Sequence, residues 1–413
     1  MNFYDVEGNI VATPLEIEGV PKIKADEDLI NSQDMIYYAG RMEKGSSRRS
    51  FCISDPSLMD IKSEGIELLK SHRGGGYEGL FETFINERRL MYVNIDYPLW
   101  KQALGKRHPE KWRVNVTGLG DVGGTLLTGL RLLGGDCISQ IGIYDRDEDR
   151  QQRWLMEAGQ IYSPFDFHEY PDVRTISEGE LFDCDMLVFC ISVAVPPVGE
   201  EVEDVRMVQL KANSKIISQY GKMAREKGYR GMFAVVSDPV DPLCKALFIS
   251  SNSNENGEID YRGLSPEQIS GYGLGVMNAR ALYYSKDDER TKDYRSQGRA
   301  YGPHGEGLVI ANSIASYDDE ASKMLTEKAK NANIEVRKSG YKPYIAPALS
   351  SGALSILSTI RGDWHYSSTF IGGAFMGVKN RLTQAGTELE RLVMDERLFD
   401  RINETYERVK SIL

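Results

Sequence analysis

A glycine-rich turn constrains the fold of this chain more than any other feature. Residues 113–117 (RVNVT) alternate like a β-strand and run directly into GLGDVGG at 118–124. Gly118, Gly120 and Gly123 complete the spacing G-x-G-x-x-G. The first glycine permits a tight turn, the second lets backbone approach a pyrophosphate, and the third lets the next helix pack closely on the strand. The pattern therefore predicts the strand–turn–helix unit of a dinucleotide-binding domain.

The residues after the turn supply the other parts of such a unit. A helix is expected over 125–133, and a second strand over 137–145 (CISQIGIYD). The strand ends at Asp145, close to the spacing of about 20 residues expected for the acid that binds the ribose hydroxyls. A carboxylate here favours NAD because it repels the additional phosphate of NADP, although the neighbouring Arg146 leaves the opposite choice open. The residues expected to line the cofactor site are Gly118, Gly120, Asp121, Val122, Gly123, Asp145, Ser192 and Ser237.

Further segments continue the alternation of strands and helices. A nearly all-apolar strand is expected at 185–192 (DMLVFCIS), a helix from about 206 to 227, and a strand at 232–238 (MFAVVSD). Near-continuous apolar strands are typical of parallel sheets covered on both faces. The order of elements predicts an α/β fold with a parallel doubly wound sheet, and the charge pattern predicts an amphipathic helix over 383–412.

Three regions are expected along the chain. Residues 1–111 are polar and turn-rich, and we interpret them as an appended α/β extension that covers the cofactor cleft or mediates assembly. Residues 112–255 form the dinucleotide-binding Rossmann domain. After about residue 255 the pattern changes to helix signals followed by short apolar stretches, so residues 256–413 are expected to form a further domain.

Composition excludes several classes of partner. The net charge of −11 and a pI near 5.2 argue against a nucleic-acid partner, since phosphate binding needs clustered positive charge. The first residues lack a basic segment followed by an apolar one, and the longest apolar run, 186–198, is too short and proline-rich to span a bilayer. Five cysteines without metal-ligand spacing predict reduced thiols, no metal site and a cytoplasmic location. They are Cys52, Cys137, Cys184, Cys190 and Cys244.

Several motifs resemble those of one enzyme family. From residue 112 to its end, the chain resembles the lactate/malate dehydrogenase family. The stretches that carry the resemblance are VTGLGDVGG (116–124), VRMVQLKAN (205–213), VVSDPVDPL (235–243), GVMNARAL (275–282) and YGPHGEG (301–307). The resemblance implies an α+β substrate-binding domain over 256–413. It also implies NAD-dependent hydride transfer between nicotinamide and a small-molecule 2-hydroxy or 2-oxo acid, and a homodimer or homotetramer.

The resemblance also assigns roles to single residues. His304 takes the place of the family's catalytic histidine, which gives or takes the alcohol proton. Arg280 corresponds to the arginine that binds the substrate carboxylate, and Arg206 to the loop arginine that closes over the reacting carbonyl. Pro239 corresponds to a proline that is often cis in the family. Asn278, beside the family's aspartate position, is expected to contact the substrate.

Two positions depart from the family pattern. The family's Asn-Pro-hydrophobic-Asp motif begins here with Asp238, so a carboxylate replaces the asparagine that normally bonds the substrate oxygen. The aspartate that orients the histidine is replaced by Met277. A catalytic histidine works best when one ring nitrogen is held by a partner. We therefore predict that Asp238 holds His304, with Glu306 as a second candidate.

Charges near the expected site argue against simple lactate as the substrate. Glu200, Glu201, Glu203 and Asp204 crowd the loop before Arg206; they form either a solvated lid or a surface that recognises a cationic group. Lys342 falls where the family often has a small polar residue lining the substrate pocket. It could bind a second carboxylate, pair with Asp238, or lie on the surface. We expect a substrate with an added polar or charged group.

Two other functions remain open on the sequence. The acidic loop and Asp238 are compatible with a dehydrogenase of an amino- or imino-bearing substrate. The loss of the orienting aspartate at Met277 is compatible with a non-catalytic NAD-binding regulatory protein. The retained His304, Arg280 and Arg206 argue against this last function, because a binding-only protein has little need for all three.

Overall fold

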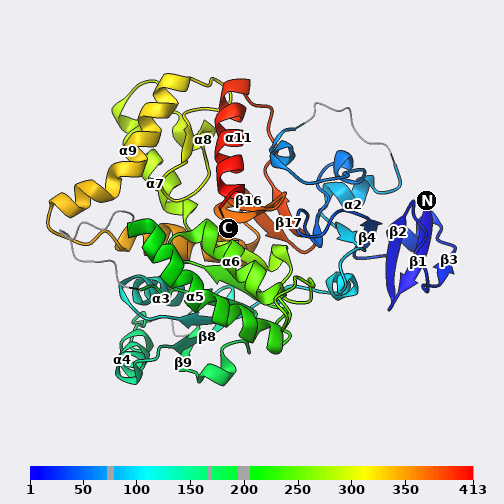
Figure 1. Ribbon diagram of the computed structural model, residues 1–413, viewed down its shortest axis with the longest axis horizontal. Helices are drawn as coiled ribbons and strands as arrows, with labels where there is room; N and C mark the ends of the chain where they lie inside the picture. The colour runs from blue at the N-terminus through cyan, green and yellow to red at the C-terminus, as the bar shows by residue number, and fades with distance from the viewer. Residues whose placement is uncertain (72–78, 166–169, 194–204, 413) are drawn as a thin grey trace.

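Two mixed β-sheets organise the chain (Figure 1). The computed structural model describes residues 1–71, 79–165, 170–193 and 205–412, with side chains in helix α5 described from Gln209 onward. A six-stranded sheet is built from the first 94 residues, and a nine-stranded sheet forms the centre of the molecule.

The central sheet has the order β17-β16-β15-β12-β11-β10-β7-β8-β9. Six of its strands are mutually parallel: β7 (Trp112–Thr117), β8 (Ile138–Tyr144), β9 (Asp172–Thr175), β10 (Met186–Phe189), β11 (Met232–Val235) and β12 (Ile269–Gly271). Three antiparallel strands extend it: β15 (His365–Ile371), β16 (Ala374–Thr383) and β17 (Gly386–Leu389). The predicted parallel doubly wound sheet is confirmed.

Helices cover both faces of this sheet, and strand β10 shows why. Leu187 and Phe189 pack with helices α5 (Val205–Glu226) and α6 (Val240–Asn252). Met186 and Val188 point to the other face. They pack there with helix α3 (Asp121–Leu133), helix α10 (Leu354–Arg361) and the preceding π-helical segment η7 (Pro347–Ala353). Successive side chains of a strand point to opposite faces, so an all-apolar strand needs cover on both. Helix α4 (Glu148–Gly159) joins β8 to β9.

Two predicted boundaries differ from the structure. The parallel sheet continues past residue 255, because β12 pairs with β11. The region 383–412 is not one helix: only α11 (Glu396–Lys410) is helical, and β17 forms a hairpin with β16. Gly386 has a φ of 102°, which suits the hairpin turn, and Leu389 of β17 packs into the same core as the N-terminal strands. Tertiary packing therefore overrides the local helical pattern.

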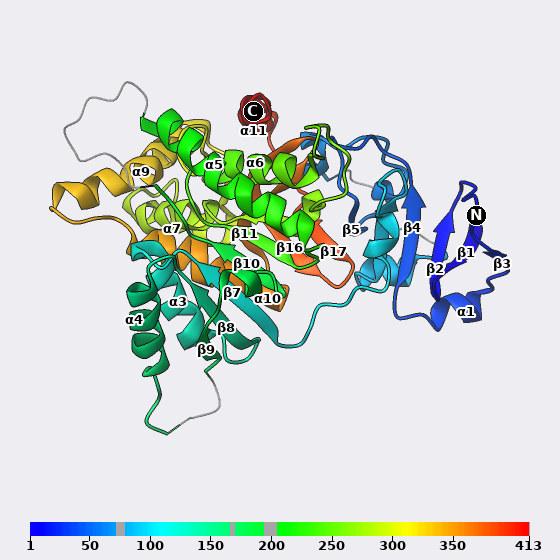
Figure 2. The ribbon, with the colours of Figure 1, turned by 60° about the horizontal axis from the view of Figure 1, so that its bottom comes forward.

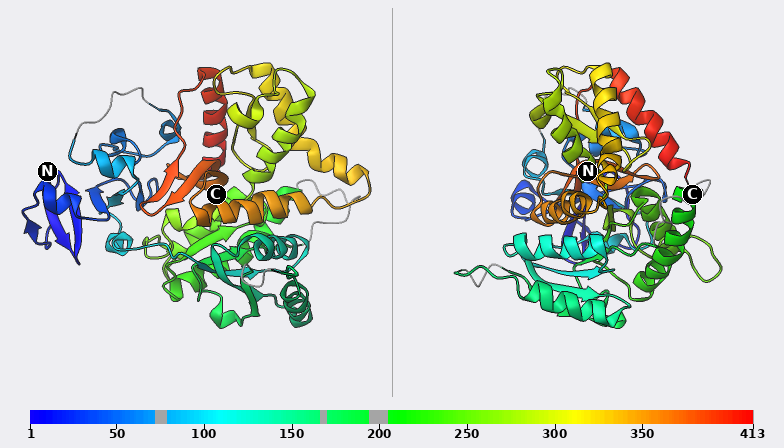
Figure 3. Two further views of the ribbon diagram at one scale, coloured as in Figure 1. Left: turned by 180° about the vertical axis from the view of Figure 1, so that it is seen from behind. Right: turned by 90° about the vertical axis from the view of Figure 1, so that its left-hand side faces the viewer.

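The N-terminal sheet has the order β3-β1-β2-β4-β6-β5. Its strands are β1 (Asn2–Val6), β2 (Asn9–Thr13), β3 (Lys22–Ile23), β4 (Ile36–Gly40), β5 (Ser50–Cys52) and β6 (Leu90–Asn94), and helices α1 (Glu27–Asn31) and α2 (Glu82–Asn86) accompany them. Phe51 and Tyr92 share one core with Ile371 of β15 and Ile402 of α11. In the left view of Figure 3, this sheet (blue) lies at the opposite end of the molecule from α9 (yellow to orange). The shared core shows that the extension packs against the C-terminal strands.

A separate group of helices lies beside the central sheet. It contains α7 (Leu274–Tyr284), α8 (Tyr294–Gln297) and α9 (Asp319–Lys338), and strands β13 (Arg299–Tyr301) and β14 (Val309–Ala311) form a short hairpin beside them. The turn of that hairpin carries the YGPHGEG sequence. Among the described helices, none has a stretch both long and apolar enough to cross a membrane.

Candidate active site

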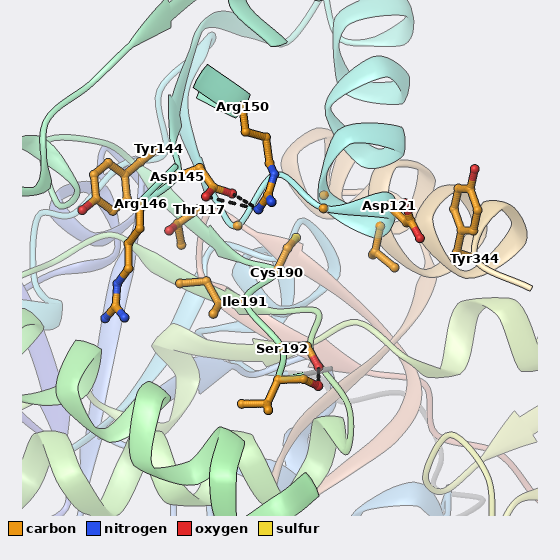
Figure 4. Close-up of a pocket in the computed structure, with 15 residues that line it drawn as sticks. Thr117, Asp121, Tyr144, Asp145, Arg146, Arg150, Cys190, Ile191, Ser192 and Tyr344 are labelled. Atoms are coloured by element: carbon orange, nitrogen blue, oxygen red, sulfur yellow. Dashed lines mark hydrogen bonds and ion pairs between the residues drawn. The ribbon is translucent and has the colours of Figure 1, made fainter. Parts of the chain in front are cut away.

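The glycine turn lines a cavity of about 430 Å³ (Figure 4). Gly118 has a φ of 86°, and a Cβ there would lie 2.8 Å from the backbone nitrogen of Ile191. A Cβ on Gly123 would lie 1.9 Å from the carbonyl oxygen of Gly118. Only glycine fits both positions, because the turn packs closely on itself and on the segment after β10. Gly120 lines the cavity and has no atom within 4 Å of where a Cβ would lie, so the backbone before α3 is open to a ligand there. We call this space the glycine-turn cavity.

Asp145 lies at the end of β8 and lines this cavity. Its Oδ2 accepts a hydrogen bond of 2.7 Å from the backbone N–H of Leu119, which ties the carboxylate to the glycine turn. Arg150 reaches the same carboxylate at 3.4 Å (Figure 4). Arg146 also lines the cavity. One carboxylate and two guanidinium groups therefore lie together where Asp145 lines the cavity.

A smaller cavity of about 140 Å³ continues from the first and contains His304 and Asp238. The two cavities share Val122, Cys190 and Ser192, and Ser237 lines only the smaller one. His304 Nδ1 lies 3.1 Å from Asp238 Oδ1. We call this space the histidine cavity. The partner predicted from the sequence is thus within hydrogen-bond distance of the histidine.

Glycines shape the turn that presents His304. Gly302, Gly305 and Gly307 all have positive φ angles, of 89°, 131° and 88°. A Cβ on Gly302 would lie 2.6 Å from the carbonyl oxygen of Gly307. The turn can therefore close tightly only with these glycines, and it holds the histidine against the end of β11. The Asp238–Pro239 peptide bond at that strand end is cis, as the resemblance implied.

Asn213 of α5 joins the two strand ends beside the histidine cavity. This side chain is completely buried. Its Oδ1 accepts a hydrogen bond of 2.9 Å from the N–H of Val193, and its Nδ2 donates to the carbonyl of Asp238 at 2.7 Å and to the hydroxyl of Ser192 at 3.4 Å. Asn213 thereby fixes the backbone of Asp238. Asn213 was not among the site residues predicted from the sequence, because its role depends on burial that a motif does not reveal.

Asp241 is a second carboxylate close to the histidine, and the sequence reasoning did not assign it to the site. It lies in the first turn of α6 and is 4% exposed. Burial raises the pKa of Asp241 to about 7; the neighbouring Ser368 and His304 oppose the rise, and Asp238 adds to it. Its place in the Asp-Pro-Val-Asp motif was the available signal. Asp238 and Asp241 therefore approach His304 from the two ends of one short motif.

The other candidate partners of His304 are engaged elsewhere or uncharged. Glu306 pairs with Lys330 at 3.6 Å and with Arg408 at 3.5 Å. These cations, led by Lys330, lower the pKa of Glu306. Met277 is buried, and its sulfur contacts a guanidinium nitrogen of Arg280 at 3.4 Å. Of the carboxylates considered from the sequence, Asp238 is therefore the one placed to hold His304.

Arg280 lines a third cavity, of about 830 Å³, that meets the histidine cavity at Val276 and Pro347. Burial lowers the pKa of Arg280, and the charge of Asp238 opposes this effect. The aromatic residues of the wall are Tyr283, Tyr284, Tyr341 and Tyr344. We call this space the tyrosine cavity. It was not anticipated from the sequence, because its residues come from α7, α9 and the segment before η7.

Two predicted substrate-binding residues have other contacts in this structure. Asn278 Oδ1 accepts a hydrogen bond of 2.9 Å from the hydroxyl of the buried Tyr294. Lys342 lies on the rim of the tyrosine cavity and pairs with Asp121 at 3.1 Å, not with Asp238. Both members of that ion pair are exposed, so the pair itself stabilises little.

Some predicted features cannot be placed. Glu200, Glu201, Glu203 and Asp204 lie outside the described residues. The backbone of Arg206 belongs to the first turn of α5, but its side chain also lies outside the described part. None of the three cavities is lined by a described residue of the extension (1–71 and 79–111), so this described part does not cover them. Among the described residues, no group of histidine, cysteine or acidic side chains is arranged to hold a metal ion.

Comparisons with known proteins point to one family. No protein-family model matches the chain. L-lactate dehydrogenase 2 of Staphylococcus aureus (strain JH9) is 22% identical over 273 residues, covering 59% of this chain and 82% of the relative. A lactate dehydrogenase from a Medee basin deep-sea metagenome library superposes with a TM-score of 0.60 at 18% identity, covering 74% of this chain and 98% of its own.

A second solved structure gives the same result. The malate dehydrogenase of Archaeoglobus fulgidus, solved in complex with NADH, superposes with a TM-score of 0.60 at 18% identity, covering 73% of this chain and 98% of its own. These matches confirm the fold that was expected from the resemblance of the motifs. Over about three quarters of its length, the chain has the fold of the lactate and malate dehydrogenases.

Proposed function

We propose that this protein is an NAD-dependent oxidoreductase that transfers hydride between nicotinamide and a 2-hydroxy or 2-oxo acid. The observation that carries the proposal is the His304–Asp238 pair at the junction of three cavities. The cavities run from the glycine turn, through the histidine, to Arg280. That order matches the positions expected for the cofactor, the reacting atoms and the substrate carboxylate. The fold shared with lactate and malate dehydrogenases supports the same assignment.

His304 is suited to move the substrate proton. Asp238 occupies Nδ1, which leaves Nε2 for the substrate oxygen. When a 2-hydroxy acid is oxidised, Nε2 accepts the hydroxyl proton while the C2–H bond breaks and its electron pair leaves as hydride. In the reverse direction, Nε2 returns the proton to the carbonyl oxygen. Asp238 stabilises the imidazolium that forms in the first case.

The glycine-turn cavity fits a dinucleotide. The open space at Gly120 leaves room for a pyrophosphate on the N-terminus of α3, and Asp145 lies where the ribose would be expected. NAD, when bound, supplies the hydride acceptor or donor. Ser192 lines both the glycine-turn and histidine cavities, and Ser237 lines the histidine cavity, so both would lie near the nicotinamide end.

Asp145 is expected to set the choice of NAD over NADP. In Asp145→Ser, Arg146 and Arg150 lose the neighbouring carboxylate and are free to bind a 2′-phosphate. We expect the ratio of kcat/KM with NADH to that with NADPH to fall on the order of 10–100-fold, which corresponds to one or two charge-assisted hydrogen bonds. Asp149→Ser is the control, since Asp149 is an exposed carboxylate of α4 that does not line the cavity. An unchanged ratio in Asp145→Ser would contradict this role.

Asp238 is expected to act through His304 and not through substrate binding. Asp238→Asn keeps the shape of the side chain but removes the charge that stabilises the imidazolium. We expect kcat to fall on the order of 10²-fold, with a changed pH profile and a nearly unchanged KM. Glu306→Gln is the matched control, because Glu306 pairs with Lys330 and Arg408. Full turnover and an unshifted pH profile in Asp238→Asn would show that Asp238 is not the partner.

The tyrosine cavity favours an acid larger than lactate. A guanidinium can hold a carboxylate with two parallel hydrogen bonds, so Arg280 would direct the rest of the substrate along the tyrosine walls. Burying an aromatic side chain there contributes about 1.5–3 kcal/mol, which corresponds to on the order of 10–100-fold in kcat/KM. Lys342 and Glu335 on the same wall could bind an added polar group.

A panel of 2-oxo acids tests the substrate assignment. We expect kcat/KM for NADH-dependent reduction of phenylpyruvate to exceed that of pyruvate at least tenfold, because burying the additional aromatic ring contributes about 1.5 kcal/mol or more. Tyr284→Ala should reduce the difference. Equal activity on pyruvate and on all larger oxo acids would contradict the assignment.

The same panel separates the two alternative functions. NADH consumption that depends on added ammonium would favour an amino- or imino-bearing substrate, for which Asp238 near the reacting atoms is the supporting observation. Binding of NADH without turnover across the panel would favour a regulatory protein. Arg206 and the acidic loop before it stay predictions in each case.

A further inference from the structure

A fourth cavity, of about 670 Å³, lies at the opposite ends of the strands that carry the glycine turn. Strand β7 begins at Trp112, which lines this cavity, and ends at Thr117, which lines the glycine-turn cavity. Figure 2 shows the connector (cyan) that leads from the N-terminal sheet into β7. Lys106 and Arg107 of this connector line the cavity. The cavity therefore lies between the extension and the dinucleotide-binding fold.

The walls of this cavity are strongly basic, in a chain whose net charge is −11. We call it the basic cavity and define it by Lys106, Arg107, Arg113, Arg174, Lys227 and Arg230. The acidic residues on its walls are Asp183 and Asp185. The basic residues come from four separate segments of the chain, so their convergence is a property of the fold and not of one charged stretch.

Few of these cations have a counter-charge. Asp185 accepts a hydrogen bond from the N–H of Arg113 at 2.8 Å and pairs with its guanidinium at 3.6 Å. Arg174 pairs with Glu180 at 3.5 Å. The remaining four make no ion pair within the described part of the chain: Lys106, Arg107, Lys227 and Arg230.

The ammonium group of Lys106 lies partly buried among these cations. It donates a hydrogen bond of 2.8 Å to the carbonyl oxygen of Arg230, so its neighbour at this point is neutral. Burial lowers the pKa of Lys106 to about 8, and the nearby Arg49 and Arg230 add to the effect, against the opposing charges of Glu267 and Asp185. Like charges that outnumber the nearby opposite charges repel one another, and a bound anion would relieve that repulsion.

We propose that the basic cavity binds a small polyanion with two or more negative groups, of the diphosphate or polycarboxylate class. Its volume lies in the range of small-molecule sites, of about 300–1,000 Å³. Arginine forks bind phosphate and carboxylate oxygens in pairs, and four unpaired cations can neutralise more than one negative group. A nucleic acid is a poor occupant, because the acidic remainder of the protein repels a long polyanion.

Calorimetric titration of the full chain with inorganic pyrophosphate and, separately, with citrate tests the proposal. The test variant is Lys227→Ala/Arg230→Ala, which removes two unpaired cations from the rim. The control is Lys215→Ala/Lys222→Ala, which removes two exposed cations of α5 outside the cavity and changes the net charge equally. We expect wild type and control to bind alike and the test variant to bind at least tenfold more weakly, as expected for lost charge-assisted hydrogen bonds.

The two probes also identify the source of the anion. Tighter binding of pyrophosphate assigns the site to phosphate-bearing metabolites, and tighter binding of citrate to polycarboxylates. Arg107→Ala provides a second variant if the double variant does not fold, and we expect it to weaken binding as well. The proposal is overturned if neither anion binds the wild type, or if the variants of the basic cavity bind as tightly as the control. Pyrophosphate held only at the glycine turn would give the latter result.

Discussion

Replacement of His304 by glutamine is expected to lower kcat by about 10²–10⁴-fold, the usual contribution of a general acid–base group. Glutamine can occupy much of the space of the imidazole, but it cannot take and return a proton. Hydride transfer would then have to form or consume an unassisted alkoxide. The loss should fall on kcat and kcat/KM alike, because the carboxylate anchor proposed for Arg280 remains.

Binding measurements separate this outcome from a folding defect. NADH affinity should be retained in His304→Gln, because the histidine lines the histidine cavity and not the glycine-turn cavity. Since Gly302 and Gly305 shape the turn, the backbone is expected to tolerate a side-chain change at 304. An unchanged turnover rate in a folded His304→Gln variant would remove His304 from the mechanism.

Replacement of Asp241 by asparagine is expected to stabilise the protein in alkaline solution. The folded-state pKa of about 7 lies above the ordinary value of 3.8, so the folded protein retains a proton that the unfolded chain releases. The contribution of Asp241 to stability is therefore complete below about pH 4 and is lost as the pH rises through 7. Asparagine avoids this loss, by up to about 4 kcal/mol at pH 8 for a shift of about three units.

Thermal unfolding from pH 4 to 9 measures this difference. We expect wild type and Asp241→Asn to have similar Tm values near pH 4 and the variant to have the higher Tm at pH 8. Asp149→Asn, which changes an exposed carboxylate of α4, should show no such dependence. A Tm difference in Asp241→Asn that stays constant with pH would mean that Asp241 is already ionised in the folded protein at neutral pH.

The sequence predicts the backbone framework well, because that framework depends on local patterns. The strand before Gly118, the helix after it and Asp145 lie within a short stretch, so periodicity and glycine spacing suffice. The pairing of His304 with Asp238 was also within reach. Two departures from a motif, one gaining a carboxylate and one losing it, together indicated which group would hold the histidine.

The remaining parts of the site depend on contacts between distant segments. Asn213 bonds two strand ends, and its role follows only from complete burial among them. Asp241 owes its raised pKa to burial, which a motif does not reveal. Lys342 pairs with Asp121, more than two hundred residues away, for reasons of tertiary packing. The prediction of one helix over 383–412 was wrong because of tertiary packing as well. Strand β17 pairs with β16 and packs on the N-terminal core, so the helix begins only after it.

Isotope transfer tests the proposed reaction most directly. NADH carrying deuterium stereospecifically at C4 is mixed with phenylpyruvate and the wild-type protein, and the product is examined by mass spectrometry. We predict that one of the two labelled stereoisomers delivers its deuterium to C2 of the resulting 2-hydroxy acid and that the other does not. Product without deuterium from either stereoisomer, or bound NADH with no product across the panel of 2-oxo acids, would contradict hydride transfer at the His304 site.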